Sequence, residues 1–125
     1  VKDSIVRVPV DKQDQGRAFH YTCGKTDMLI VVSLKLGLMT CGEIRFRGAA
    51  ALVDRGGANR VILCMGDRII CFGHEVNVKP AGSVEVASDE SGLRVTNRSV
   101  EAATVSVGDR STSLPAGRTW RVPVA

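Results

Sequence analysis

Apolar and polar residues alternate with a period of two in short segments along the whole chain. Successive side chains of a β-strand point to opposite faces, so this period predicts strands that are buried on one face only. The 18 valines suit a pleated strand, and the 13 glycines can supply the turns between strands. The alternating segments are Val6 to Val10, Phe19 to Cys23, Ile44 to Phe46, Val76 to Val78, Val84 to Val86, Leu93 to Val95, Val105 to Val107 and Trp120 to Val124.

The spacing of the turn residues predicts an all-β fold, either a β-sandwich or a flattened barrel of roughly ten short, mostly antiparallel strands. A chain of 125 residues fits one such domain. The 44% hydrophobic content and the net charge of +4 are not those of a disordered chain. The longest apolar run, Met28 to Val32, is too short to span a membrane, so no membrane insertion is expected.

Three local patterns carry more specific expectations. The β-branched centre of residues 27–36 favours a strand that is buried on both faces. Ala49 to Leu52 is expected to be a strand rather than a helical turn. Gly66-Asp67 and Gly108-Asp109 each lie between apolar segments, so both are predicted to be two-residue hairpin turns.

The four cysteines are Cys23, Cys41, Cys64 and Cys71. An even number in a small exported domain is compatible with two disulfides, although buried free thiols are the alternative. With a hairpin at Gly66, Cys64 and Cys71 would share a face diagonally, which is often too far for a bridge, whereas a bridge between Cys23 and Cys41 is sterically open.

Because the chain begins at Val1 without Met, a removed leader or preceding domain is expected. An extracellular or periplasmic location is therefore predicted, with a cytoplasmic one left open.

The two ends of the chain carry the same four-residue pattern, Arg-Val-Pro-Val, at residues 7–10 and 121–124. Proline cannot donate to a sheet ladder, so both terminal strands are predicted to be edge strands. Residues 1–16 are interpreted as an N-terminal strand and a polar linker that a neighbouring copy can exchange, and residues 17–125 as a single β domain. The predicted contacts of this exchange are Ile5, Val6, Val8, Val10, Val122 and Val124.

The sequence contains no strong catalytic or cofactor motif, so neither an enzyme nor a bound cofactor is predicted. His20 with Cys23 and Cys71 with His74 raise the alternative of a zinc site. Residues three apart on a strand point to opposite faces, however, so no metal site is expected.

These observations predict a non-enzymatic structural or protein-interaction module, whose partner is itself or another protein. The basic composition leaves one alternative, because 12 of the 17 basic residues are arginines, which bind carboxylate and phosphate in a bidentate manner. The alternative function is the binding of a polyanion, a nucleic acid or an acidic polysaccharide. Its predicted residues are Arg45, Arg47, Arg55, Arg60 and Arg68.

Overall fold

The computed structural model describes residues 3–10, 16–34, 37–56 and 59–122, which form strands joined by turns and loops. The strands are β1 (Asp3–Val8), β2 (Gly16–Cys23), β3 (Thr26–Ser33), β4 (Met39–Cys41), β5 (Ile44–Arg47), β6 (Ala50–Asp54), β7 (Arg60–Cys71), β8 (His74–Asp89), β9 (Gly92–Asn97), β10 (Ala103–Val107), β11 (Arg110–Leu114) and β12 (Thr119–Arg121). The all-β prediction is confirmed, with twelve strands in the described residues.

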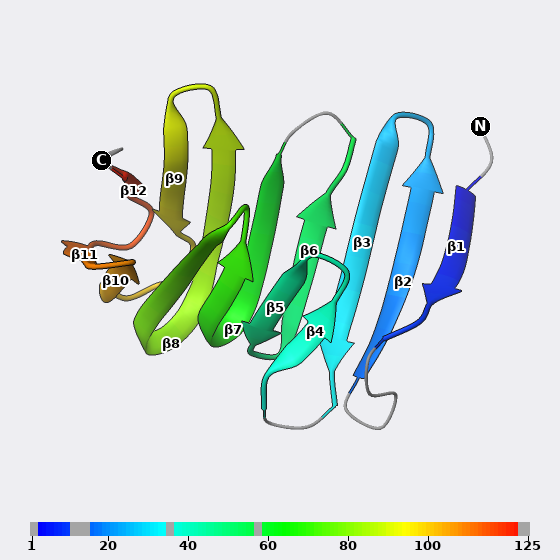
Figure 1. Ribbon diagram of the computed structural model, residues 1–125, viewed down its shortest axis with the longest axis horizontal. Helices are drawn as coiled ribbons and strands as arrows, with labels where there is room; N and C mark the ends of the chain where they lie inside the picture. Colours follow the sequence, from blue (N-terminus) through cyan, green and yellow to red (C-terminus); the bar gives the residue numbers. More distant parts are fainter. Residues whose placement is uncertain (1–2, 11–15, 35–36, 57–58, 123–125) are drawn as a thin grey trace.

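The two longest strands, β7 and β8, organise the sheet. The first half of β7 pairs with β6 and its second half with β5, while the two halves of β8 pair with β10 and β9. The sheet therefore doubles over into two layers (Figure 1). One layer, here called the long layer, has the order β1-β2-β3-β6-β7-β8-β9-β12, and the short layer has the order β4-β5-β7-β8-β10-β11. All pairs are antiparallel and the sheet is not closed, so the fold is that of a flattened sandwich.

The core lies between these layers and is built mainly from small aliphatic side chains. Phe46 on β5 and Ile69 on β7 enter it from the short layer, and Val31 and Leu63 enter it from the long layer. On β5 the alternation predicted from the sequence is confirmed, because Ile44 and Phe46 are buried and their arginine neighbours are exposed. The sandwich therefore buries one face of each strand, as the period of two requires.

The strand β7 does not turn at Gly66-Asp67, as the sequence predicted, but continues through it. The register with β8 shifts on both sides of Gly66, which marks a bulge where the strand bends from one layer into the other. The hairpin turn comes later, at Phe72-Gly73, where both residues have positive φ, 53° and 76°. The second prediction is confirmed, since Gly108-Asp109 joins β10 to β11.

Gly66 is required at this bend because the backbone of Gly48 and Arg47 passes close to it. A Cβ added to Gly66 would lie 2.4 Å from the Arg47 carbonyl oxygen and 2.7 Å from Leu63 Cδ1.

We expect Gly66→Ala to lower the free energy of unfolding by about 2 to 3 kcal/mol, because the clash with the Arg47 backbone cannot be relieved by a change of rotamer. Urea unfolding measures this loss. Gly108→Ala is the comparison: its Cβ meets open space, so only left-handed strain, about 1 kcal/mol, is expected. Equal losses in both variants would contradict the clash.

The strand β3 corrects the expectation of a segment buried on both faces. Leu29 and Val31 are buried, but Met28, Ile30 and Val32 on the opposite face are only half-buried. The core covers one side of β3, and no described element covers the other. An apolar outer face is therefore left on the long layer.

Candidate interaction site

The doubled sheet has four edge strands in its described part: β1, β4, β11 and β12 each pair with a single strand. An open edge presents unpaired backbone groups and invites another chain, and natural proteins shorten such edges or make them polar. Strands β4 and β12 have three residues each, and β11 has the polar sequence Arg-Ser-Thr-Ser-Leu. These three edges are therefore protected against pairing with another chain, two by their short length and one by its polar side chains.

The edge formed by β1 lacks this protection. It has six residues, and its two large apolar side chains at the centre are exposed, Ile5 to 69% and Val6 to 56%. The antiparallel register with β2 places Ile5 opposite Tyr21 and Val6 opposite His20, so the two side chains lie on opposite faces of the sheet. Figure 1 shows β1 at the outer end of the long layer, with its far edge free of any described strand.

The sequence-predicted contacts at the N-terminus fall on or beside this edge. Val8 ends β1 and Val10 follows it, and both are partly buried against the core. At the other end of the chain, Val122 is buried and follows β12, while Val124 lies outside the described residues. The edge position predicted for the terminal strands from Pro9 and Pro123 agrees with the single partners of β1 and β12, although Pro123 itself lies outside the described residues.

The predicted exchange segment, residues 1–16, can be placed only in part. Strand β1 pairs with β2 of the same chain, and residues 11–15 of the linker lie outside the described residues. Gly16 already belongs to β2, where a Cβ would lie 2.4 Å from Met39 Cε. The division of the chain at residue 16 stays a prediction.

Next to β1, the outer face of the long layer is apolar across four strands. The register aligns Phe19 on β2 with Ile30 on β3, Leu52 on β6 and Ile62 on β7, and all four are half-buried. A second row begins at Ile5 and continues through Tyr21 and Met28. Contiguous apolar surface on a soluble domain often marks a binding surface.

This outer apolar face was not predicted from the sequence. The sequence placed Phe19 and Tyr21 on one face of a half-buried strand, whereas in the structure the opposite face of β2, which carries the fully buried Ala18, packs against the core. His20 shares the face of Ala18, and its Nε2 donates a hydrogen bond of 2.5 Å to Asp27 Oδ1. The signal available in the sequence was that β2 and β3 carry apolar residues in both alternating sets.

Farther along the same face, on β6 to β9, ion pairs replace the apolar residues. Arg60 lies 2.8 Å from Asp54 Oδ2, and Arg98 lies 2.7 Å from Glu85 Oε1. The pKa of Asp54 is lowered, first by the hydrogen bond from the Gly56 amide and then by that from Arg60. The apolar part of the face is therefore bordered by charges that are already paired.

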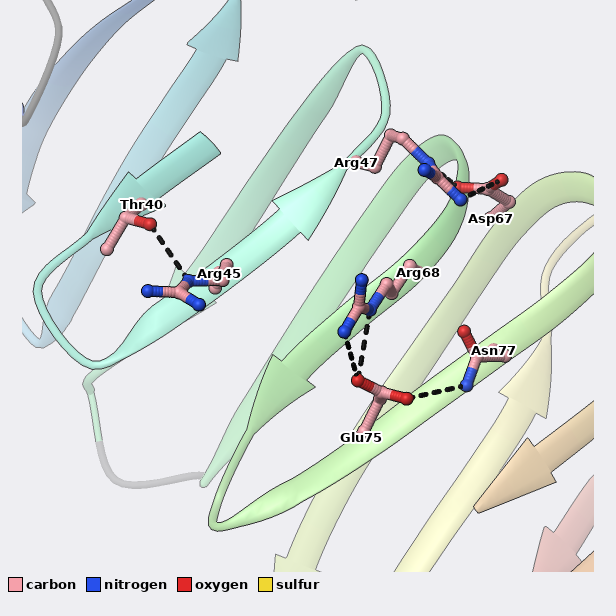
Figure 2. A network of polar contacts seen from close by, with 7 residues as sticks. All are labelled: Thr40, Arg45, Arg47, Asp67, Arg68, Glu75 and Asn77. Carbon is pink, nitrogen blue, oxygen red and sulfur yellow. Dashed lines mark hydrogen bonds and ion pairs between the residues drawn. The ribbon is translucent and has the colours of Figure 1, made fainter. Parts of the chain in front are cut away.

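The outer face of the short layer is mostly polar, with Ile70 between Arg45 and Glu75 as an apolar exception, and Figure 2 shows its central part. Arg47 donates from Nε and Nη2 to the two oxygens of Asp67 at 2.8 and 2.9 Å. Arg68 donates to Oε1 of Glu75, and Oε2 of the same carboxylate accepts a hydrogen bond from Asn77 Nδ2 at 3.2 Å. These bonds lower the pKa values of Asp67 and Glu75, each chiefly through its arginine, and raise the pKa of Arg47.

The five arginines predicted for polyanion binding are divided between the two layers. Arg45, Arg47 and Arg68 lie on the short layer, where Arg45 donates to Thr40 Oγ1 at 3.1 Å (Figure 2). Arg60 lies on the outer face of the long layer, and Arg55 is exposed in the loop after β6. The carboxylates of Asp67, Glu75 and Asp54 thus occupy three of the five guanidinium groups.

The four cysteines are free in the structure, so the disulfides considered from the sequence are not formed. Cys41 and Cys71 are buried, and Cys23 and Cys64 are half-buried. Because β7 continues through Gly66, Cys64 pairs with Ala50 of β6 rather than lying diagonal to Cys71. Burial raises the pKa of Cys71 to about 12 and also raises that of Cys64, which disfavours the thiolate that nucleophilic or metal-binding cysteines need.

The histidines and cysteines of the zinc alternative are not gathered into a site. Cys71 and His74 pair across the Phe72-Gly73 turn, whereas His20 and Cys23 lie on β2. Among the described residues, no group of three or more His, Cys, Asp or Glu side chains is placed to hold a metal ion. The sequence therefore suggested a grouping that the strand order does not produce.

Comparison with models of known protein families, with curated protein sequences and with solved structures finds no match for this chain. None of the described residues belongs to a helix long and apolar enough to cross a bilayer. The β1 edge and the apolar face beside it are thus identified on physical grounds alone. We call these two together the β1 site, made of Ile5, Val6, Phe19, Tyr21, Met28 and Ile30.

Proposed function

We propose that this protein is a non-enzymatic structural or protein-interaction module that assembles with itself by strand addition at the β1 site. The observation that carries the proposal is the exposure of Ile5 and Val6, 69% and 56%, at the centre of an edge strand. Strand addition pairs the open backbone groups of such an edge, and side chains on both faces then add apolar contacts.

The contrast with the other surfaces supports this proposal. The three remaining edges are short or polar, and the short layer is covered by arginine and carboxylate side chains that bind each other. Charged pairs of this kind favour a solvated surface. The polyanion alternative stays a prediction, as does the extracellular or periplasmic location, and no contact among the described residues favours either.

Placing charge on the β1 edge tests the proposal. We expect the wild-type chain to sediment as an oligomer, and the double variant Ile5→Lys, Val6→Lys as a monomer of 13.3 kDa. Lysine on an edge strand opposes edge-to-edge pairing because its ammonium group would have to be desolvated. Both residues are largely exposed, so the fold should tolerate the change, and urea unfolding verifies this. Sedimentation velocity at several concentrations measures the mass.

Val100→Lys is the matched control. Val100 is 95% exposed in the loop between β9 and β10, so the variant adds a lysine in place of an exposed apolar residue away from the β1 site, with one added charge instead of two. It should remain an oligomer. A wild-type chain that is monomeric at every concentration, or a double variant that still assembles like the control, would refute self-assembly through β1.

A further inference from the structure

The strand that adds to the free edge of β1 can be specified further, and this step rests on the proposed function. We infer that the partner is β1 of a second copy, related by a two-fold axis that passes between the two Ile5 residues perpendicular to the sheet. Two copies of the long layer then form one continuous sheet. The inference follows from three properties of β1: its allowed registers, its charges and the apolar row that it continues.

Symmetry restricts the registers to a few. A two-fold axis perpendicular to the sheet keeps the outer faces of both copies on the same side, and residues directly opposite in an antiparallel pair share a face. The axis must therefore lie midway between the same residue in the two copies, so that one residue of β1 faces its own counterpart. Within β1 the central choices are Ser4, Ile5 and Val6.

Charge complementarity selects Ile5. With the axis at Ile5, the backbone register places position 3, an aspartate in the sequence, opposite position 7 of the second copy, an arginine, and this pairing of positions occurs twice. With the axis at Val6, Ile5 would face Arg7 instead, and with the axis at Ser4, Arg7 would have no residue of β1 opposite it. Opposite charges directly across a ladder stabilise the pair, whereas an apolar residue opposite a charge gains less.

The apolar rows of the two copies meet in this arrangement. Ile5 lies on the outer face in register with Tyr21 and Met28, and the second Ile5 continues that row into the second copy. On the other face, Val6 lies opposite Ser4 of the second copy, which leaves room for the Val6 side chain. In this arrangement the exposed surface of Ile5 is covered by its own symmetry mate, so a second copy supplies both the opposite charges and the apolar contact.

Cysteine cross-linking tests the position of the axis. Single Ile5→Cys, Ser4→Cys and Val6→Cys variants are oxidised with glutathione disulfide, beside wild type as the control for the native thiols. Directly opposite Cα atoms lie about 4.5 to 5.5 Å apart, within the range of a disulfide, whereas residues offset by two positions lie beyond it. We expect Ile5→Cys to form the covalent dimer at least about ten-fold faster than the other two single variants. Mixing Ser4→Cys with Val6→Cys should restore rapid cross-linking.

A charge swap tests the register independently. Arg7→Asp and Asp3→Arg should each weaken the dimer by about ten-fold, because like charges then face each other twice. The double variant Asp3→Arg, Arg7→Asp should restore the wild-type dissociation constant. A dimer in which Val6→Cys or Ser4→Cys reacts fastest, or in which the swap does not rescue, overturns the register but leaves the proposed function standing. A monomeric wild type overturns both.

Discussion

Replacing Asn97 with aspartate is expected to lower the free energy of unfolding by about 4 kcal/mol at pH 7, the largest loss we expect from a change of so few atoms. Asn97 ends β9 and is fully buried. It is the one polar side chain among the buried residues of the described chain. A loss of this size is a large fraction of the stability of a small domain.

The reason is the arrangement of the Asn97 amide. Its Nδ2 donates to the carbonyl oxygens of Glu101 and Leu114, both at 2.9 Å, and its Oδ1 accepts from the Ser99 amide at 2.8 Å. The side chain thereby ties the loop after β9 to the end of β11. Aspartate keeps the acceptor but points a second oxygen at two carbonyl oxygens, and it also buries a charge without a counter-ion.

The pH dependence separates this mechanism from a general loss of packing. Burial and the facing carbonyls should raise the pKa of an aspartate at position 97 above that of the unfolded chain. The folded state then binds the proton more tightly, so the deficit should shrink as the pH falls, because a protonated carboxyl can donate one hydrogen bond. Urea unfolding at pH 7 and pH 4 measures both values. The exposed Asn59→Asp is the control and should change stability by no more than about 0.5 kcal/mol. A loss at position 97 that matches this control would disprove the role of the amide.

The alternation of residues was sufficient to predict the strands themselves, but not always the face that each one buries. On β5 the apolar set is Ile44 and Phe46 and the polar set is two arginines, so only one assignment is possible. On β2 and β3 both sets contain apolar residues. Which set is buried depends on which side the short layer covers, and that is decided by the bend of β7 and β8, far along the chain.

That bend was itself out of reach of local reasoning. Gly-Asp between apolar segments is equally typical of a two-residue turn and of a bulge. The close approach of Gly48 to Gly66 distinguishes the two, and this contact joins residues that local patterns treat separately. The hairpin prediction at Gly66 and the diagonal placement of Cys64 and Cys71 were wrong for this one reason.

The candidate site was predicted in part. Ile5 and Val6 were identified from the position of β1 at the terminus and from Pro9, which are local signals. The neighbouring Phe19, Tyr21 and Met28 were not, because they are only half-buried for a reason that lies in the fold: no described element covers the outer face of β2 and β3. For the arginines predicted to bind a polyanion, the sequence did not indicate their carboxylate partners Asp67, Glu75 and Asp54. These carboxylates come within reach of the arginines only when the strands are paired.

Raising the pH should destabilise this protein through Cys71, and the loss should amount to about 4 kcal/mol by pH 12. Cys71 is the last residue of β7 and is 2% exposed. Burial raises the pKa of its thiol from the ordinary value of 9.0 to about 12. Between these two pH values the unfolded chain has lost the thiol proton while the folded chain keeps it. Unfolding then releases a proton, so the free energy of unfolding falls by about 1.4 kcal/mol for each pH unit.

Comparison with Cys71→Ala isolates this effect from the other groups that titrate at high pH. The variant is expected to be less stable than wild type at pH 7, because it leaves a small cavity. From pH 9 upward the two curves should converge and then cross, since only wild type carries the linked proton. Cys64→Ala retains Cys71 and should follow the steep wild-type slope more closely, as Cys64 is only half-buried. Urea unfolding at intervals between pH 7 and pH 11 gives the slopes, and parallel curves for wild type and Cys71→Ala would show that the Cys71 thiol ionises as readily in the folded chain as in the unfolded one.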